Sequence, residues 1–444
     1  MPKQFSMGLV SCLKMVSNST RRHSPNFIAA KVLMKVFDGQ PLENALFEHH
    51  ESKDSALLTF LCYTTMRHYY SLHERLSDIS HRPLDRLDIE VKCLLLLGAC
   101  QLQYSTLPAP LAVAHVVSAA RKLGKTSAGG LINAVLRRYD TDIEPRTEEA
   151  RLELPHWMIN RIQSEYASEM EDIFRTSTCR APMTLRVNRR EISTDEYCKL
   201  LCEHKIPFQK TVLENAITLE KPTSKSKLPG YEEGWFSVQD LASQLPVSLL
   251  EPMPDNRILD ACAAPGIKSQ QIADTFAMNP VDAYDIKPQC STWNIATPQD
   301  KWKNLTFKQG NLTTTEWWDG KPYERILLDV PCTGSGTISR HPDIKVTRQD
   351  ADVSQVAELQ LELLKNLWTV LAIDGILVYS TCSIFKEEND EVIEQFLADT
   401  LDAATESFEL PIGRATREGW QTIPSESEHD GFYFARLRKL GRNT

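Results

Sequence analysis

Residues 258–266 read Ile-Leu-Asp-Ala-Cys-Ala-Ala-Pro-Gly. Their apolar start predicts a short buried strand over 257–261, and the small residues after it predict a tight turn into a helix that begins near Lys268. Further apolar runs predict strands at 282–286, 324–329 and 375–380. Helical periodicity occurs at 270–276 and 352–371. Strands that alternate with helices in this way predict an α/β fold with a parallel, doubly wound sheet.

Two cysteines follow two of these strands closely: Cys332 in Asp-Val-Pro-Cys and Cys382 in Ser-Thr-Cys. In an open α/β sheet, ligands and chemistry gather at the carboxyl ends of the strands. We therefore expect Cys332, Cys382 and Asp329 to meet at one edge of the sheet. A lone cysteine is more often a small buried hydrophobic residue. Two at equivalent strand ends favour covalent chemistry on a nucleobase.

A cofactor site is expected at the same edge. Asp285 ends the second strand, where a carboxylate would accept hydrogen bonds from both ribose hydroxyls of an adenosyl ligand. The turn at 261–266 lacks the Gly-x-Gly-x-x-Gly cradle for a pyrophosphate, which argues against a nicotinamide cofactor. The amino terminus of the next helix favours a polar or anionic group. Together these features predict S-adenosyl-L-methionine; the alternative is an ordinary turn beside a solvated acid.

The same residue types fit the methylation of cytosine at C5. This carbon is a poor nucleophile until a thiolate adds to C6, and after methyl transfer the C5 proton must leave before the thiol is expelled. Asp329 would support the adduct near N3 and O2. A free thiol has a pKa of about 8.5; Lys268 would lower that pKa and an ionised Asp329 would raise it. The spacing leaves open which of Cys332 and Cys382 attacks.

The remaining sequence predicts further domains. The 444 residues are enough for two or three of them. We expect a disordered leader at 1–20, an all-α domain at 21–145, a small α+β linking domain at 146–230 and the α/β domain at 231–440. Helices of the all-α domain are predicted from Pro25 to about Gly39 and at 55–70, 88–103, 110–122 and 130–139. Residues 431–437 predict a late antiparallel edge strand.

Composition narrows the class of protein. The chain is 42% hydrophobic and 25% charged, and it has no apolar stretch long enough to cross a membrane. Eleven cysteines without a Cys-x-x-Cys pair predict free thiols in a reducing, cytoplasmic location and no metal site. The net charge is −9, yet basic clusters at 1–40 and 181–230 permit RNA binding. We expect a monomer.

Several segments carry a resemblance to a known family. Residues 260–266, 329–336 with 340–343, and 380–383 with Glu387-Glu388-Asn389 resemble the signature blocks of the RNA 5-methylcytosine methyltransferases, the Nol/Nop/Sun family. Residues 235–240 and 430–432 match its flanking blocks, and the helical front resembles a NusB-like RNA-binding domain. The combination is similar to bacterial members that modify 16S ribosomal RNA. It implies a Rossmann-like class I methyltransferase domain preceded by the NusB-like and linking domains.

The resemblance also implies roles. Cys382, in the Thr-Cys motif, would be the nucleophile; Cys332, in the Pro-Cys motif, would assist release of the methylated base; and Asp329 would face the base. Apart from the resemblance, Arg340 and His341 lie just beyond Cys332, and we expect them to guide the base. The residues implied to contact the methyl donor are Cys262, Ala263, Ala264, Pro265, Gly266, Ile267, Lys268, Asp285, Asn311 and Asp329.

The chain departs from the family pattern at three places. Ile267 replaces a second glycine, Asn311 replaces an acid on the adenine side, and Lys-Pro-Gln-Cys at 287–290 replaces a basic helix. These changes predict a weaker or atypical donor pocket. The alternative to an enzyme is a non-catalytic RNA-binding ribosome-assembly factor whose methyl-donor pocket has decayed.

Overall fold

The computed structural model describes residues 24–49, 55–286 and 302–441. The expected leader at 1–20 and the unusual segment at 287–290 lie outside these ranges. The chain divides into two compact units, Met1–Arg151 and Leu152–Thr444. The reacting groups expected from the sequence all belong to the second unit.

The first unit is helical, as the sequence predicts. Helix α5 is its centre, because nearly every side chain from Val91 to Gln101 is buried. The predicted helix at 55–70 is two helices, since the chain breaks at His68, where φ is −112°. The helices are α1 (Pro25–Phe37), α2 (Leu42–Phe47), α3 (Ser55–Arg67), α4 (Tyr69–Ile79), α5 (Ile89–Tyr104), α6 (Ala109–Lys122), α7 (Gly129–Leu136) and α8 (Glu148–Leu152).

The second unit begins with a small α+β part. Its antiparallel sheet has the order β2-β3-β1-β4, and helix α11 begins with a capping box formed by Ser193 and Glu196. Strand β4 follows residue 230, the expected end of the linking domain, and pairs with β1. The elements are α9 (His156–Glu165), α10 (Met170–Thr176), β1 (Met183–Val187), α11 (Thr194–Glu203), β2 (Phe208–Lys210), β3 (Ala216–Leu219) and β4 (Phe236–Val238).

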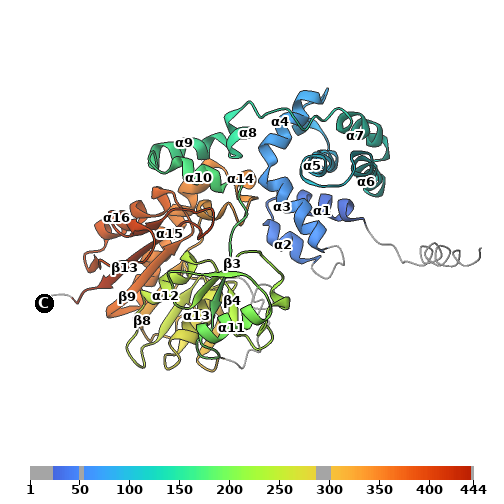
Figure 1. Cartoon of the computed structure of the whole chain (residues 1–444). Helices are drawn as coiled ribbons and strands as arrows, with labels where there is room; N and C mark the ends of the chain where they lie inside the picture. Colours follow the sequence, from blue (N-terminus) through green and yellow to red (C-terminus); the bar gives the residue numbers. More distant parts are fainter. Residues whose placement is uncertain (1–23, 50–54, 287–301, 442–444) are drawn as a thin grey trace, which may run out of the picture. The chain divides into compact units, whose positions relative to one another are not determined.

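The larger sheet has the order β11-β12-β13-β9-β8-β5-β6-β7, and its five strands from β9 to β7 are parallel. The predicted doubly wound α/β fold is confirmed (Figure 1). The strands are β5 (Ile258–Ala261), β6 (Val281–Asp285), β7 (Leu305–Gln309), β8 (Tyr323–Asp329), β9 (Leu371–Thr381), β10 (Ala403–Thr405), β11 (Arg414–Ala415), β12 (Trp420–Thr422) and β13 (Phe432–Lys439).

One strand differs from its prediction. Strand β13 is antiparallel, as expected, but it is not at the edge, because it pairs with β9 on one side and with β12 and β10 on the other. Its residues from Phe432 to Ala435 are all buried. A strand that buries both of its faces belongs in the interior of a sheet, since an edge strand normally exposes polar groups to solvent.

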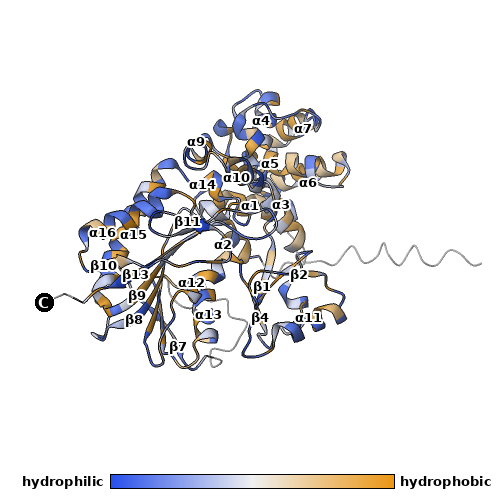
Figure 2. Cartoon of the chain, turned by 60° about the vertical axis from the view of Figure 1, so that its left-hand side comes forward, coloured by the Kyte–Doolittle hydropathy of each residue, from blue (hydrophilic) through white to orange (hydrophobic). Residues whose placement is uncertain are grey.

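Helices cover both faces of this sheet. Helices α15 (Asp350–Val370) and α16 (Asp390–Asp399) pack on one face, and α12 (Leu245–Ser248) and α13 (Ile267–Thr275) on the other. The alternation of strand side chains divides the core: Leu377 and Tyr379 contact the first pair of helices, whereas Ile376 and Val378 contact the second. Hydrophilic residues of α15 and α16 face outward (Figure 2).

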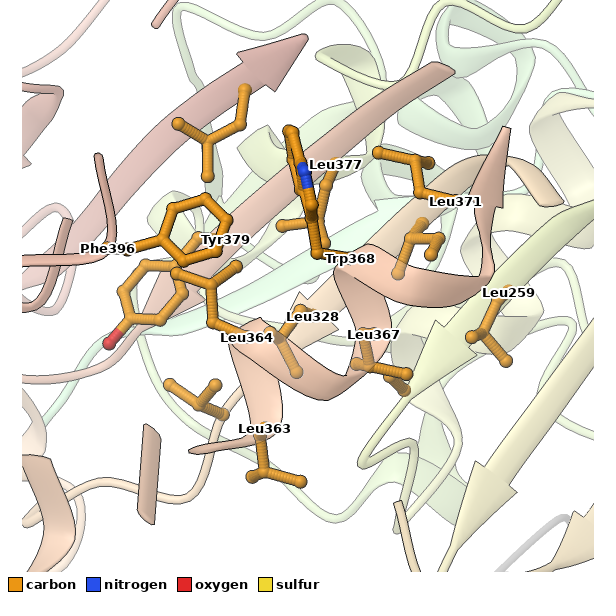
Figure 3. Close-up of a cluster of buried hydrophobic side chains, with 14 of the residues drawn as sticks. Leu259, Leu328, Leu363, Leu364, Leu367, Trp368, Leu371, Leu377, Tyr379 and Phe396 are labelled. Carbon is orange, nitrogen blue, oxygen red and sulfur yellow. The ribbon is translucent and has the colours of Figure 1, made fainter. Parts of the chain in front are cut away.

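The α15 face holds the larger hydrophobic cluster. Leu364, Leu367 and Trp368 from α15 point toward the strand residues Leu328 and Leu377 (Figure 3). Each fully buried Leu of this kind contributes roughly 1.5–3 kcal/mol to folding. This packing fixes the positions of β8 and β9 relative to α15. It therefore also fixes where the segments after their carboxyl ends begin.

The order of the strands places a crevice at those ends. Strand β5 lies between β6, the next strand in the chain, and β8. The connections after β5 and β8 therefore leave the sheet on opposite sides, and such a switch point is where open α/β sheets bind ligands.

Candidate active site

The two thiols predicted to meet at the sheet edge lie in contact. The Sγ atoms of Cys332 and Cys382 are 3.0 Å apart, although 50 residues separate them in the chain. Strands β8 and β9 run in register with Asp329 opposite Ser380. Cys332 comes three residues after Asp329 and Cys382 two after Ser380, so the parallel pairing delivers both sulfur atoms to one place.

Cys332 differs from an ordinary thiol. Its hydrogen bond with Cys382 and its burial raise the pKa of Cys332 well above the usual value, and the charge of Glu388 adds to the rise. Either sulfur could donate by geometry alone. The raised pKa favours the protonated form of Cys332, which can donate to Cys382.

Asp329 is held by two neighbours. Lys268 Nζ donates to its Oδ2 at 2.7 Å, and Ser380 Oγ donates to its Oδ1 at 2.6 Å. Burial works against the charge on Lys268, but Asp329, and more weakly Cys382, outweigh that effect and raise the pKa of Lys268. Lys268 is therefore a permanent cation beside both Asp329 and Cys382.

The segment after β8 is clamped by backbone contacts. Gly336 N donates to the carbonyl of Cys382 at 2.9 Å, and Gly431 N donates to the carbonyl of Gly336 at 2.8 Å. A Cβ at residue 336 would lie 2.1 Å from the Gly431 oxygen, so only glycine allows this approach. The clamp fixes the Cys332 segment against both Cys382 and the start of β13.

The turn after β5 has an unusual backbone. Cys262 has φ of 60° and Gly266 has φ of 95°, so the chain turns back sharply before α13 begins at Ile267. Ala263 N donates to the Tyr284 carbonyl at 2.9 Å, and Ala264 N donates to Asp285 Oδ2 at 3.0 Å. These two hydrogen bonds hold the turn against the end of β6. The predicted donor site would need the turn and Asp285 to be adjacent in this way.

The other predicted donor residues lie around this turn. Pro265 is exposed, and Ile267 is half-buried in the first turn of α13. Asn311 is exposed just after β7, and Gly310 N donates to the Asp285 carbonyl at 3.0 Å. The Asn311 side-chain oxygen accepts from Thr313 N and Oγ1 at 3.1 and 3.0 Å. Asn311 is thus close to Asp285 in the fold, but its oxygen is engaged within its own turn.

Arg340, which was expected to guide the base, is held by buried acids. Its guanidinium donates to Asp430 Oδ2 at 2.7 Å, to Asp240 Oδ2 at 3.2 Å and to the Pro182 carbonyl. Burial raises the pKa of Asp240 to about 7, with Asp430 adding to the rise and Arg340 opposing it. Two buried carboxylates and a carbonyl thus hold the guanidinium of Arg340, and its contact with a base stays a prediction.

Three polar residues at the thiols lie within the quoted signature blocks but were given no role from the sequence. Thr333 and Ser383, each directly after a cysteine, donate to the buried carboxylate of Glu388. The sequence signal was weak, since hydroxyl residues beside a cysteine are common and Glu388 stands within an acidic run. Its partners are brought together only by the fold.

The described part of the chain contains neither a cluster of metal ligands nor a membrane-spanning helix. Within 24–49, 55–286 and 302–441, there is no group of three or more His, Cys, Asp or Glu residues that could hold a metal ion. In the same ranges, every helix is too short or too polar to span a bilayer.

Family comparisons cover the three parts of the fold. Residues 247–438 match the family described as 16S rRNA methyltransferase RsmB/F, and residues 24–141 match the NusB family. Residues 154–225 match the ferredoxin-like domain of the RsmF/B-like methyltransferases. The expected NusB-like, linking and methyltransferase architecture is confirmed.

Solved structures share the fold. The crystal structure of PH0851 has a TM-score of 0.80 and 22% identity, covering 95% of this chain and 100% of that chain. A methyltransferase homologue protein from Pyrococcus horikoshii has a TM-score of 0.56 and 25% identity, covering 66% of this chain and 97% of its own.

Curated relatives extend over almost the whole sequence. Ribosomal RNA small subunit methyltransferase B of Pseudomonas syringae pv. tomato is 37% identical over 94% of this chain and 97% of its own length. The probable ribosomal RNA small subunit methyltransferase B of Coxiella burnetii is 36% identical over 87% of this chain and 93% of its own length. The resemblance drawn from the signature blocks is confirmed: the chain belongs to the ribosomal RNA small subunit methyltransferase B family.

Proposed function

We propose that this protein transfers a methyl group from S-adenosyl-L-methionine to C5 of a specific cytosine in 16S ribosomal RNA. The observation that carries the proposal is the pair of thiols, Cys332 and Cys382, 3.0 Å apart at the carboxyl edge of the sheet. Two thiols side by side fit a reaction in which one adds to the base and the other helps the product to leave. The names of the relatives support ribosomal RNA as the substrate.

The residues around the β5 turn fit the proposed methyl donor. Asp285 ends β6 with its carboxylate already oriented by Ala264 N, which suits hydrogen bonds from ribose hydroxyls. The positive φ angles at Cys262 and Gly266 bring backbone close to a ligand at the start of α13. When bound, S-adenosyl-L-methionine supplies an electrophilic methyl group on a sulfonium sulfur.

Cys382 would begin the reaction. Its sulfur contacts that of Cys332 at 3.0 Å and lies near the cation of Lys268, which would stabilise a thiolate there. It would add to C6 of the cytosine, which makes C5 nucleophilic toward the methyl group. Asp329, protonated when the base is bound, would donate to N3 and so support the negative charge that develops at N3 and O2.

Cys332 would complete the reaction as a base. The leading cause of its raised pKa is the hydrogen bond to Cys382, whose charge also contributes. When Cys382 bonds to C6, the hydrogen bond that contributes most to the raised pKa of Cys332 is lost, and Cys332 would give its proton to solvent. The Cys332 thiolate would then take the C5 proton, the C6–S bond would break, and Cys382 would depart as a thiolate. In this order of steps, Cys332 would act as a general base only after the methyl transfer has made the C5 proton ready to leave.

Labelled donor and unmodified 16S RNA test the proposal directly. We expect wild-type protein to form 5-methylcytosine, the Cys332→Ala variant to accumulate RNA bound covalently through Cys382, and the Cys382→Ala variant to form neither product nor adduct. Trapping by Cys382→Ala in place of Cys332→Ala would reverse the two roles. Absence of 5-methylcytosine with folded, donor-bound protein would refute the activity.

Ile267 in the first turn of α13 and the engaged oxygen of Asn311 motivate a second candidate. A ribosome-assembly factor with a decayed donor pocket would bind RNA without catalysis. Calorimetry with S-adenosylhomocysteine separates the two, because a decayed pocket gives no binding heat. We expect measurable binding, since the turn and Asp285 retain their arrangement.

A further inference from the structure

Glu388 is a buried carboxylate outside the set of residues assigned to the reaction. It lies six residues after Cys382, at the end of the 3-10 helix Lys386–Glu388, and is 0% exposed. Among the described residues, the donors that contact its carboxylate are uncharged: Thr333 N and Oγ1, Ser383 Oγ and Gln360 Nε2. Burial raises the pKa of Glu388, and the hydrogen bonds from Ser383, Thr333 and Gln360 oppose that rise by stabilising the carboxylate.

The carboxylate joins the two cysteine segments. Its Oε1 accepts from Thr333 Oγ1 at 2.5 Å and from Ser383 Oγ at 2.6 Å. Its Oε2 accepts from Thr333 N at 2.8 Å. Thr333 directly follows Cys332, and Ser383 directly follows Cys382. One side chain is therefore bonded to the neighbours of both sulfur atoms.

Two further contacts make this junction rigid. Gln360 on α15 donates to the Pro331 carbonyl at 2.8 Å and to Glu388 Oε2 at 3.3 Å, so it holds the residue before Cys332 as well. Tyr379 OH donates to the Glu388 carbonyl at 2.7 Å. The carboxylate is thus held by α15 and by both cysteine segments, and the backbone of Glu388 is held by β9.

We propose that Glu388 is the positioning residue of the thiol pair: its carboxylate holds the Cys332 and Cys382 segments so that the two sulfur atoms stay in hydrogen-bond contact. The inference rests on the proposed function, because positioning matters only if both thiols react. It assigns Glu388 no contact with RNA or methyl donor.

The charge of Glu388 also favours the hydrogen bond between the two thiols. The groups that face Cys332 are Cys382, Glu388 and Tyr379, with Lys268 close to Cys382. Glu388 raises the pKa of Cys332, and a protonated Cys332 is the form that donates to Cys382. Removal of the charge should therefore let Cys332 ionise at a lower pH and weaken the distinction between the two thiols.

The Glu388→Gln variant tests the charge while it keeps the shape of the side chain. The first readout is the rate of iodoacetamide alkylation of each cysteine between about pH 7 and about pH 10, followed by mass spectrometry without RNA or donor. We expect alkylation of Cys332 to begin at lower pH than in wild type. The second readout is steady-state kinetics: kcat falls by about 10- to 100-fold, whereas KM for RNA stays within about twofold of wild type, because no RNA contact is lost.

Glu391→Gln is the matched control. Glu391 is exposed on α16, three residues from Glu388, and its substitution should leave kcat and both alkylation profiles unchanged. Ser383→Ala and Thr333→Val each remove one hydroxyl bond and keep the carboxylate. They should lower kcat less than Glu388→Gln does, and they provide the test if that variant fails to fold.

The outcomes separate the inference from the proposed function. A folded Glu388→Gln variant with wild-type kcat and an unchanged Cys332 profile would overturn the inference, and so would wild-type kinetics in both hydroxyl variants. If wild-type protein transfers no methyl group but Glu388→Gln still shifts the Cys332 profile, the proposed function fails while the coupling of Glu388 to the thiols stands.

Discussion

Lys268 Nζ lies 2.7 Å from Asp329 Oδ2, and this ion pair joins the two sides of the crevice at the switch point. Lys268 belongs to α13, which follows β5, and Asp329 ends β8. The pair therefore sets the distance between the proposed donor turn and the thiols. It also places a positive charge beside the residues that would carry negative charge during the reaction.

Substitution Lys268→Met should reduce catalysis strongly. It leaves Asp329 with Ser380 as its remaining hydrogen-bond donor among those described and removes the cation near Cys382. We expect kcat to fall by about 100- to 1000-fold, the usual loss when one group that stabilises a reacting centre electrostatically is removed. Steady-state methyl transfer to 16S RNA measures the effect. Lys268→Arg keeps the charge and should retain more activity; equal activity of the Met variant and wild type would contradict a role for the ion pair.

Mild oxidation should inactivate the protein reversibly. The sulfur atoms of Cys332 and Cys382 are 3.0 Å apart, so a small movement brings them to the disulfide bond length of about 2.05 Å. Hydrogen peroxide would take two hydrogen atoms from the two thiols and be reduced to water. We expect a peptide pair linked through these residues in mass spectrometry, loss of methyl transfer, and recovery of activity with dithiothreitol.

The control for oxidation is donor binding. Disulfide formation should leave S-adenosylhomocysteine binding within about twofold of the reduced protein, because Asp285 and the β5 turn are unchanged. Permanent loss of activity without a Cys332–Cys382 link would show that the sulfur atoms are oxidised separately.

Asp260 should make stability depend on pH. Burial raises its pKa to about 7, with Asp329 and Asp285 adding to the rise and Ser269 opposing it. Its folded pKa thus lies above the unfolded value of about 3.9. Between these two pH values the folded protein keeps a proton that the unfolded chain loses, so this contribution is present at low pH and disappears as pH rises through about 7. The free energy of unfolding should fall over this window.

The substitution Asp260→Asn isolates this effect. Relative to wild type, the variant should gain stability steadily from about pH 5 to about pH 7.5, measured by urea unfolding at each pH. The comparison uses the difference between the two proteins, which cancels the other titrating groups, including Asp240. A constant difference across this range would mean that Asp260 is ionised in the folded protein throughout.

Gly336→Ala should destabilise the second unit. Its Cβ would lie 2.1 Å from the backbone oxygen of Gly431, which cannot move without breaking the contact between the Cys332 segment and β13. We expect a loss of about 1–3 kcal/mol, as for other overpacked sites, together with lower activity. The control is Gly441→Ala, whose Cβ would meet Ile373 at an ordinary 3.5 Å. Equal unfolding free energies of the two variants would contradict the clamp.

The order and type of the main elements could be read from the sequence because local signals agree with the fold. The strand predicted at 257–261 is β5 apart from Arg257, and that at 324–329 is β8 apart from Tyr323. Both are apolar runs bounded by turn residues, so propensity and burial point the same way. The cysteines could be placed at one edge because parallel strands align their carboxyl ends.

Contacts between residues far apart in the chain could not be predicted from the sequence. Whether β13 is an edge or an interior strand depends on β12, which is three residues long and has no clear periodicity. Arg340 was assigned to the base because it follows Cys332 closely, yet its partners Asp240 and Asp430 are 100 and 90 residues away. Glu388 was passed over for the same reason: the 55 residues between it and Thr333 hide their contact from any local pattern.

Asp274 on α13 links the small α+β part to the Rossmann-like part through buried hydrogen bonds. Its carboxylate accepts from Arg186 and Asn188 of the small sheet region at 3.1 Å each, and from Trp302 at 2.7 Å. Arg186 and Asp274 are both nearly inaccessible to solvent, and a buried ion that loses its partner is costly. A chimaera that takes the small part from a relative would therefore leave Asp274 buried without the partner of its charge. Arg186 and Asp274 must be exchanged together to avoid that cost.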